Sequence, residues 1–299
     1  MAFVELRERL LIQVSARDVY DAVQLAGHPG SGLLFTGQAA HDAIRMVRRH
    51  GYDGPVMADR RRYAGSARIR GTARLSPHWI ADQVEAGATA VLTDSGYVGD
   101  GDHEALAAIL DQATGWDGAV AVLPVHPRWV TRDRELLLGA VRAYGGPVAL
   151  VVEDGPPYTQ LRSLRRYEPL SLPLMSAGVA AFGALACGAE WAAIGVREVL
   201  RHLYPEPHAA VGGWRRGGAR SAFVAERLEF VPVERLRRET CACSTCGGRA
   251  MRWMRDASEL EVNTHNSKAL HAMHVRLLRS HRRQAWWSQL TQGTGQAVG

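Results

Sequence analysis

The chain has 299 residues, with 36 Lys and Arg against 30 Asp and Glu, and 46% of its residues are hydrophobic. This hydrophobic content excludes a disordered chain, and no run of about 18 uncharged apolar residues is present that would span a membrane. The first residues, MAFVELRERLLIQV, carry charges through their apolar stretch, so they do not match a signal peptide. We expect a cytoplasmic protein of two ordinary domains or one large α/β barrel with an appendage.

The positive charge is concentrated in the last third of the chain. From Arg201 onward there are 16 basic and 8 acidic residues, whereas the first 200 residues carry 20 basic and 22 acidic groups. A basic end on a near-neutral body is typical of a protein that binds a phosphate backbone. A surface that only keeps the protein soluble gives the same pattern.

Short apolar runs recur along the first 200 residues, and helical patterns separate them. The runs cover 32–36, 55–58, 90–93, 119–124, 147–152, 172–175 and 191–195. The helical patterns cover 41–50, 76–86, 102–113 and 132–143. Continuous apolar strands that alternate with helices predict a parallel sheet buried on both faces.

An eighth strand is predicted at 227–231, and eight strands favour a (β/α)8 barrel over the alternative, an open doubly wound sheet. The predicted organisation is a barrel over residues 1–232, a helical zinc-binding subdomain over 233–290 and a flexible tail over 291–299. The Gly/Arg-rich stretch 212–220 is predicted to be a loop near the end of the barrel.

Polar residues follow several of the predicted strands, where the chemistry of such barrels takes place. These residues are Asp59, Asp94, His126, Glu153, Asp154 and Ser176. An acidic residue in this position also commonly caps the next helix, so a single carboxylate is weak evidence for a site.

Three of the four cysteines lie within six residues, at Cys241, Cys243 and Cys246, and His265 follows after a predicted helix. Three thiolates and one imidazole form a closed tetrahedral shell that suits Zn²⁺. A full shell leaves no position for a substrate, so the predicted zinc is structural. His271 and His274 are alternative fourth ligands, and a redox pair is an alternative role for the thiols.

Arginines near the predicted zinc site recur at helical spacing. They are Arg249, Arg252 and Arg255 in one row, and Arg276, Arg279 and Arg283 in another. Each row is placed on one helix face, which either contacts phosphates or is merely solvated. The pair Trp286 and Trp287 either stacks on a base or packs against the barrel.

The cysteine segment resembles the C-terminal part of the tRNA-guanine transglycosylases. That family carries CxCxxC, a helix and then N-T-x-H-N, which is matched here by the three cysteines and Asn263-Thr-His265-Asn266. One residue is missing in the last element, and the connecting helix is shorter. The resemblance implies that His265 is the fourth zinc ligand, and it implies a barrel fold.

Weaker resemblances lie earlier in the chain. Gly54-Pro-Val-Met-Ala-Asp59 is similar to the family's G-P-I-L-T-D segment, but Arg60-Arg-Arg-Tyr63 follows where the family has S-G-G-F/Y-Q. The strand that ends at Asp94 is similar to one that ends in a substrate-reading aspartate. The stretch 174–178 is similar to the family's L-M-G-V-G strand.

The resemblance implies the exchange of guanine for a 7-deazaguanine base in tRNA or, in a related branch, in DNA. Asp59 would then be the acid/base, and Asp94 would read the base edge. His126, Gly155 and Ser176 are further candidates for substrate binding. The partners implied are nucleic acid, the guanine or 7-deazaguanine base and a second subunit in a homodimer or heterodimer.

The nucleophile of the family has no match. Ala193 stands where the family has aspartate in G-I-D-M-F-D. Glu190, Glu198 and Asp154 are candidates for a displaced carboxylate. If none of them serves, the chain is a catalytically inactive barrel that binds nucleic acid or a partner subunit. A third alternative is an unrelated barrel that acts on a small phosphorylated metabolite.

Overall fold

The computed structural model describes residues 4–66, 68–153, 171–204 and 220–294. Seven parallel strands form one sheet in the order β3-β2-β1-β7-β6-β5-β4. Their bounds are β1 Arg9–Ser15, β2 Ser31–Thr36, β3 Val56–Asp59, β4 Ala121–Val125, β5 Val148–Val152, β6 Leu174–Ala177 and β7 Trp191–Gly195.

The segment 89–93 joins the two edges of this sheet. The amide of Thr89 donates to the carbonyl of Val56 in β3 over 2.8 Å, and the amide of Val120 donates to the carbonyl of Val91 over 2.8 Å. Leu92 and Val120 form a parallel bridge next to β4. The sheet therefore curls round with 89–93 in the place of an eighth strand, as a TIM-type barrel requires.

One predicted barrel strand was wrong, and one barrel strand was not predicted. The predicted eighth strand, 227–231, is not in the barrel, because β8 (Ser221–Val224) pairs with β9 (Glu229–Pro232) in a separate antiparallel hairpin. The barrel instead begins with β1, which the sequence did not single out. β1 lies between β2 and β7 in parallel register, so the N-terminal segment occupies the middle of the sheet.

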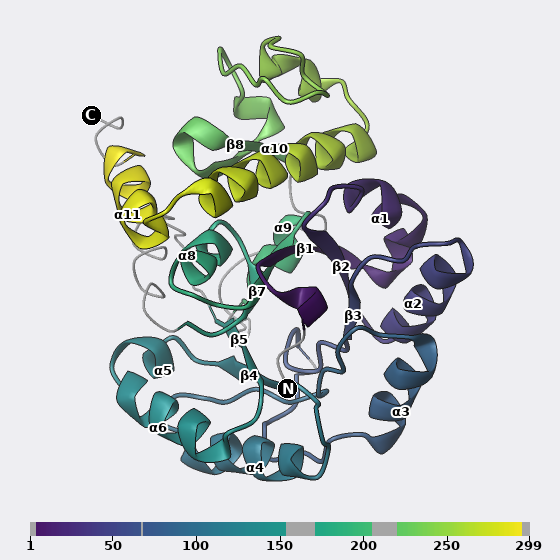
Figure 1. Cartoon of the computed structure of the whole chain (residues 1–299), viewed down its shortest axis with the longest axis vertical. Helices are drawn as coiled ribbons and strands as arrows, with labels where there is room; N and C mark the ends of the chain where they lie inside the picture. Colours follow the sequence, from purple (N-terminus) through teal and green to yellow (C-terminus); the bar gives the residue numbers. More distant parts are fainter. Residues whose placement is uncertain (1–3, 67, 154–170, 205–219, 295–299) are drawn as a thin grey trace.

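Helices surround the strands on the outside (Figure 1). They are α1 Val19–Leu25, α2 Ala40–Arg49, α3 Pro77–Ala86, α4 His103–Thr114, α5 Arg128–Thr131, α6 Arg134–Tyr144, α8 Ala180–Ala186 and α9 Glu198–Arg201. The four predicted helices correspond to α2, α3, α4 and α6. In α3 the Ser76 hydroxyl accepts the amide of Trp79, and Gly87 ends the helix with φ +80°. A glycine suits this left-handed position because it has no Cβ.

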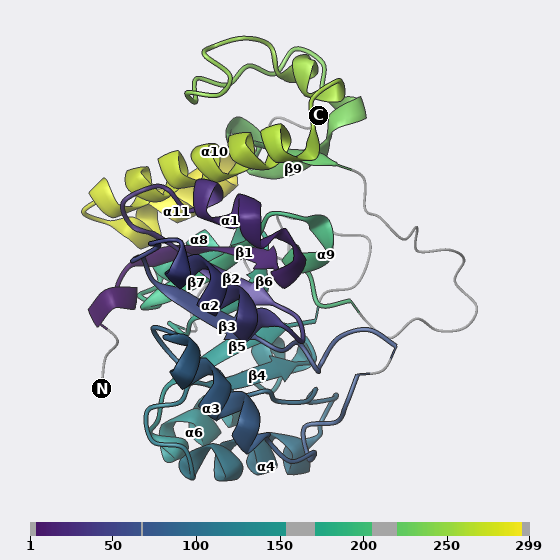
Figure 2. The same cartoon turned by 90° about the vertical axis from the view of Figure 1, so that its right-hand side faces the viewer.

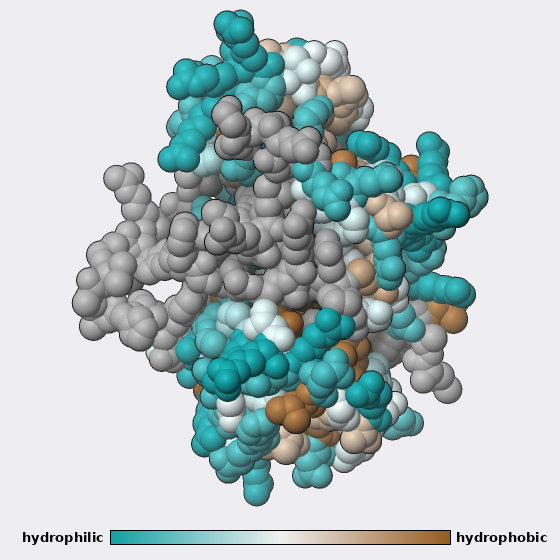
Figure 3. Space-filling view, turned by 90° about the vertical axis from the view of Figure 1, so that its left-hand side faces the viewer, coloured by the Kyte–Doolittle hydropathy of each residue, from teal (hydrophilic) through white to brown (hydrophobic). Residues whose placement is uncertain are grey.

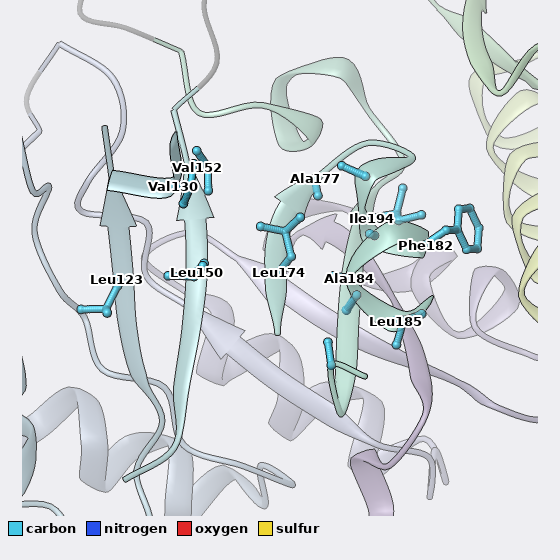
Figure 4. Close-up of a cluster of buried hydrophobic side chains, with 14 of the residues drawn as sticks. Leu123, Val130, Leu150, Val152, Leu174, Ala177, Phe182, Ala184, Leu185 and Ile194 are labelled. Atoms are coloured by element: carbon cyan, nitrogen blue, oxygen red, sulfur yellow. The ribbon is translucent and has the colours of Figure 1, made fainter. Parts of the chain in front are cut away.

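The core has an inner and an outer layer because alternate residues of a strand face opposite sides of the sheet. Leu11, Met57 and Ala193 belong to the cluster inside the barrel. Leu150, Leu174 and Ile194 instead face outward, into the cluster that packs against the helices (Figure 4). Phe182 and Leu185 of α8 belong to the same cluster, and α8 packs on β6 and β7.

The C-terminal part lies across one side of the barrel (Figure 2). It holds the β8–β9 hairpin, a loop with the three clustered cysteines, α10 (Glu259–Arg279) and α11 (Arg283–Thr294). Ser258 and Glu261 form a capping box that begins α10. Trp287 of α11 is buried against Phe182 of α8, at 6.3 Å between ring centroids. α11 extends into the stretch that the sequence predicted as a tail.

Short 3-10 turns complete the described chain. They are η1 Val4–Leu6, η2 Ala16–Asp18, η3 Ala225–Arg227, η4 Val233–Arg235 and η5 Met251–Arg255. The face drawn in Figure 3 is mainly hydrophilic over the described residues, with small separate hydrophobic patches. Within the part of the chain that the structure describes, no helix has the length and apolar character needed to cross a membrane.

Candidate active site and metal centre

A polar layer closes the carboxyl end of the barrel interior. The apolar layer below it contains Leu11, Leu34, Met57, Leu92 and Val151. Two residues further along each of these strands stand Gln13, Thr36, Asp59, Asp94 and Glu153. Because side chains alternate along a strand, these polar residues face the same interior, and all five are buried. Three carboxylates are thus brought to one end of the barrel.

Asp59 is 1% exposed and is the most enclosed of the three carboxylates. Its Oδ2 accepts the Tyr63 hydroxyl over 2.6 Å, and its Oδ1 accepts the amide of Arg61 over 2.9 Å. Burial raises the pKa of Asp59, and the hydrogen bond from Tyr63 only partly opposes this. A raised pKa favours the protonated form of a carboxyl group, which is the form that acts as a general acid.

Gln13 hydrogen-bonds to residues of two neighbouring strands, and one of these, Ser176, lies beside the tyrosine that binds Asp59. Its Nε2 donates to Thr36 Oγ1 over 2.9 Å and to Ser176 Oγ over 3.0 Å, and its Oε1 accepts the amide of Ser176 over 2.8 Å. Ser176 has φ +48°, which is unusual for a residue with a Cβ. The bonds to Gln13 hold Ser176 in this conformation, 3.4 Å from the hydroxyl of Tyr63.

Asp94 is engaged by two arginines. Its Oδ2 lies 2.8 Å from Arg60 and 2.7 Å from Arg62, and its Oδ1 accepts the amide of Ser76 over 2.9 Å. The arginines follow β3 directly, in the segment that departs from the family's motif. In this arrangement both carboxylate oxygens of Asp94 are already engaged, so Asp94 is not an open acceptor for a base.

Glu153 is one of the polar residues that the sequence places after a strand, but the sequence assigned it no catalytic role. It is 4% exposed, pairs with Arg68 over 2.8 Å and accepts the Tyr97 hydroxyl over 2.5 Å. Arg68 also lies over the Tyr97 ring, 4.0 Å from its centroid. The available signal was its position two residues after Val151, which is inward-facing and apolar.

The structure does not bring the other candidates into this layer. Glu190 is exposed and precedes β7, at the opposite end of the barrel. Glu198 is half-buried at the start of α9, beside Tyr204. His126 accepts the amide of Arg128 at the start of α5, which is a structural role. Asp154 and Gly155 lie outside the described residues.

The geometry of β7 explains why this strand supplies no carboxylate to the polar layer. Ala193 is level with Leu11 of β1, so it belongs to the apolar layer. The residue of β7 that reaches the polar layer is Gly195. A Cβ at Gly195 would lie 2.4 Å from the backbone carbon of Leu200. α9 therefore packs so tightly on the end of β7 that no carboxylate fits there.

An open cleft adjoins the polar layer at the ends of β1 and β2. It has a volume of about 640 Å³, and Ser15, Thr36, Gly37, Gln38 and His41 contribute to its lining. The amide of Gly37 donates to the carbonyl of Asp59 over 2.9 Å. Gly37 has φ +124°, and no atom lies within 4 Å of a Cβ built there, so backbone is exposed to a ligand. The volume suits a small ligand.

The second site is the predicted metal centre. The ligand atoms of Cys241, Cys243, Cys246 and His265 all lie within 4.8 Å of one another, so this cluster could hold a metal ion. His265 Nδ1 is 3.5 Å from Cys243 Sγ and 3.3 Å from Cys246 Sγ. A tetrahedral zinc with its usual bond lengths separates sulfur and nitrogen ligands by about 3.6 Å, so the donor set fits zinc.

The contacts of the cysteine loop and of α10 explain the roles of the CxCxxC motif and of the His-Asn pair. Gly247 and Gly248 have φ +58° and +84°, and their amides donate to the carbonyls of Cys243 and Cys241. His265 Nε2 lies 3.0 Å from the carbonyl of Phe223, which leaves Nδ1 for the metal. Asn266 binds the same strand, because its Oδ1 accepts the amide of Phe223 over 2.7 Å. The histidine and the asparagine thus fasten α10 to β8.

The alternative metal ligands have other contacts. His271 stacks on His28, with ring centroids 4.4 Å apart, and His274 Nε2 lies 2.9 Å from the carbonyl of Glu8. Neither belongs to the cluster with the cysteines. Cys187 is half-buried at the end of α8.

The arginines predicted to contact nucleic acid form no single face. Arg249 lies over the Trp253 ring at 4.1 Å, and Arg252 and Arg255 belong to the short turn η5. Arg276 and Arg279 are exposed in the last turn of α10. Arg283, the third member of the second row, begins α11 and pairs with Glu8, so this row does not lie on one helix face as predicted. The first row lies mostly on a 3-10 turn.

Known proteins resemble this chain only weakly. No protein-family model matches the sequence, and no curated protein matches it. Among solved structures, triosephosphate isomerase from Bartonella henselae is similar over 62% of this chain and 92% of that chain, with 12% sequence identity and a TM-score of 0.34. The barrel assignment therefore stands on the strand order and the hydrogen bonds described above.

Proposed function

We propose that this protein exchanges guanine for a 7-deazaguanine base in tRNA or DNA. The observation that carries the proposal is the polar layer, where Asp59, Asp94 and Glu153 are buried together at the catalytic end of a barrel. Buried carboxylates with different partners can take different protonation states, which base exchange needs. The motif resemblance to the transglycosylases supplies the reaction, and the Cys3His cluster agrees with it.

Asp59 is proposed as the acid/base. Its raised pKa favours the protonated form, from which it gives a proton to the departing guanine. Tyr63 and the amide of Arg61 fix the orientation of the carboxyl group. After the base departs, the resulting carboxylate accepts a proton from the entering 7-deazaguanine.

Glu153 is proposed as the nucleophile in place of the family's aspartate. Its carboxylate oxygen attacks C1′ of the sugar, the bond from C1′ to the guanine nitrogen breaks, and the nitrogen takes the bonding electrons together with the proton from Asp59. The entering base then attacks C1′ and releases Glu153. The Arg68 guanidinium and the Tyr97 hydroxyl hold the Glu153 carboxylate in a fixed orientation.

Zinc at Cys241, Cys243, Cys246 and His265 is proposed as structural. Four protein ligands fill a tetrahedral shell, so the ion contributes folding energy rather than a reactive position. It would fasten the cysteine loop to α10, and α10 to the β8–β9 hairpin through Phe223.

The second candidate function is a catalytically inactive barrel that binds nucleic acid or a partner subunit. Ala193 and Gly195 favour it, because neither β7 position offers a carboxylate. The two functions differ in whether Glu153 is required for a covalent step.

The test is incubation with labelled guanine or a labelled 7-deazaguanine, with tRNA and duplex DNA in separate reactions. Label entering either polymer supports the enzyme. Glu153→Gln should then abolish incorporation, whereas Glu85→Gln, an exposed carboxylate on α3, should not change it. Salt-dependent binding without incorporation in either polymer favours the inactive barrel.

A further inference from the structure

Three consecutive arginines lie at the mouth of the barrel. Arg60, Arg61 and Arg62 follow β3 and precede the buried Tyr63. Arg60 and Arg62 both form ion pairs with Asp94, and both contact the same carboxylate oxygen. Asp59 accepts the Tyr63 hydroxyl and the amide of Arg61, and no guanidinium pairs with it among the described residues. Within this part of the chain, Asp94 is thus the one carboxylate with which the three guanidinium groups form ion pairs.

Arg61 is the one of the three whose guanidinium pairs with no carboxylate among the described residues, although its backbone amide donates to Asp59. Its guanidinium donates to the carbonyls of Val199 over 2.5 Å and His202 over 3.3 Å. Its Nε is buried and has no hydrogen-bond partner among the described residues. Its φ is +60°, a left-handed conformation that costs about 1 kcal/mol or more for a residue with a Cβ. Strain of this kind often marks a functional position.

Arg60 and Arg62 keep part of their side chains open to solvent. Their side chains are 31% and 25% exposed, whereas the side chain of Asp94 between them is fully buried. A guanidinium has five N–H donors in a planar fork, more than these contacts use. Both arginines can therefore bind a second anion from the solvent side without leaving Asp94.

We propose that Arg60, Arg61 and Arg62 form a phosphate-binding site at the barrel mouth. Guanidinium groups bind phosphate oxygens through paired hydrogen bonds, and a site that carries excess positive charge attracts them. The site takes the sugar-phosphate backbone of the substrate strand beside the nucleotide whose base enters the polar layer. This inference rests on the proposed function, and it adds a contact that the exposed arginines of the C-terminal part do not provide.

A second effect follows from the shared carboxylate. A phosphate bound to Arg60 and Arg62 weakens their hold on Asp94, because each guanidinium then divides its charge between two anions. Asp94 becomes available to accept N–H groups from the edge of a base. Binding of the backbone thus prepares the reading of the base.

Arg61→Gln is the main variant because it leaves the ion pairs of Asp94 intact. The measurement is fluorescence anisotropy of a labelled short duplex at several salt concentrations. We expect binding about five- to tenfold weaker at low salt and a salt slope reduced by about one, because one phosphate contact is lost. Arg61→Lys should retain most of the affinity, since it keeps the charge.

Arg142→Gln is the matched control, since Arg142 is exposed at the end of α6 next to the start of β5, at the opposite end of the barrel. It should leave affinity and salt slope as in the parent protein. Thermal melting of all variants checks that the fold is intact. A folded Arg61→Gln protein with the parent's affinity and slope would overturn the proposal, and so would an equal loss in Arg142→Gln.

Competition with a nucleoside 5′-monophosphate tests whether the site binds a nucleic-acid strand or a small phosphate compound. If the mononucleotide displaces the duplex at an equal concentration of phosphate groups, the site does not require a strand, and the proposal is overturned. The phosphate-binding site and the exchange reaction can each be refuted without the other. Weaker duplex binding by Arg61→Gln supports the site even if no label is incorporated. Incorporation with unchanged binding by Arg61→Gln removes the site and leaves the reaction.

Discussion

His274 makes the attachment of α10 to the barrel sensitive to acid. It is buried in α10, and its Nε2 lies 2.9 Å from the carbonyl of Glu8 near the start of the barrel. Its Nδ1 is buried without a hydrogen-bond partner among the described residues. His271 lies beside it, with ring centroids 6.5 Å apart, and His28 stacks on His271. A proton on His274 would therefore be poorly solvated.

The size of the effect follows from the pKa. Burial lowers the pKa of His274 from 6.5 to about 4, and the charge of Arg283 acts in the same direction. The nearby Glu8 carboxylate and carbonyl oppose this shift without cancelling it. The folded protein binds this proton more weakly than the unfolded chain, so the stabilisation is complete above pH 6.5 and is lost as the pH falls towards 4. The full loss is about 3 kcal/mol.

The assay is denaturant unfolding across this pH range. His274→Gln keeps an N–H donor for the carbonyl of Glu8 and cannot be protonated, so its stability should fall about 3 kcal/mol less than that of the parent between neutral and acid pH. His202 is half-buried and its pKa is lowered to about 4, so the parent and the variant share a second acid-sensitive contribution. The difference between variant and parent is therefore the decisive quantity. His50→Gln, on the surface after α2, is the control. Equal pH dependence in His274→Gln and the parent would refute the reasoning.

Three further outcomes are expected. Cys243→Ser should release the bound metal and lower the melting temperature, as measured by elemental analysis and calorimetry, and a chelator should do the same to the parent. Asp59→Asn should reduce base exchange by about 100-fold or more while the fold persists, as seen in incorporation of label and circular dichroism. Gly183→Ala should destabilise by about 1–3 kcal/mol, because its Cβ would lie 2.9 Å from Trp287 Nε1. Gly139→Ala, in open space on α6, should instead stabilise by up to about 1 kcal/mol in the same denaturation experiment.

The sequence predicts most of the barrel because each internal strand is a short apolar run closed by a turn. It fails at β1, where Gln13 interrupts the apolar pattern and makes the segment resemble an exposed one. Gln13 is polar because it belongs to the polar layer, where it binds Thr36 and Ser176. The run 227–231 was predicted as a barrel strand because its composition suits any strand. Its pairing with β8 depends on the metal loop and α10, which lie later in the chain.

The metal cluster was predictable because its ligands are close in sequence and the chemistry of thiolates is specific. The carboxylate site was only partly predictable because its members are distant in sequence. Glu153 looks like any acidic residue after a strand until Arg68 and Tyr97, more than 50 residues earlier in the chain, are placed on it. The arginines after β3 likewise look like a solvated run until Asp94 is found between them.

The layers also predict what happens if an aspartate replaces Ala193, the position that resembles the aspartate of the transglycosylases. Ala193→Asp would place a carboxylate level with Leu11, inside the apolar layer and below the polar one. A buried charge without a partner costs several kcal/mol, so the variant should be strongly destabilised and should not exchange bases faster than the parent. Chemical denaturation and incorporation of label measure the two effects. A stable Ala193→Asp protein with faster exchange would show that β7 still supplies the nucleophile position, and the role proposed for Glu153 would then be wrong.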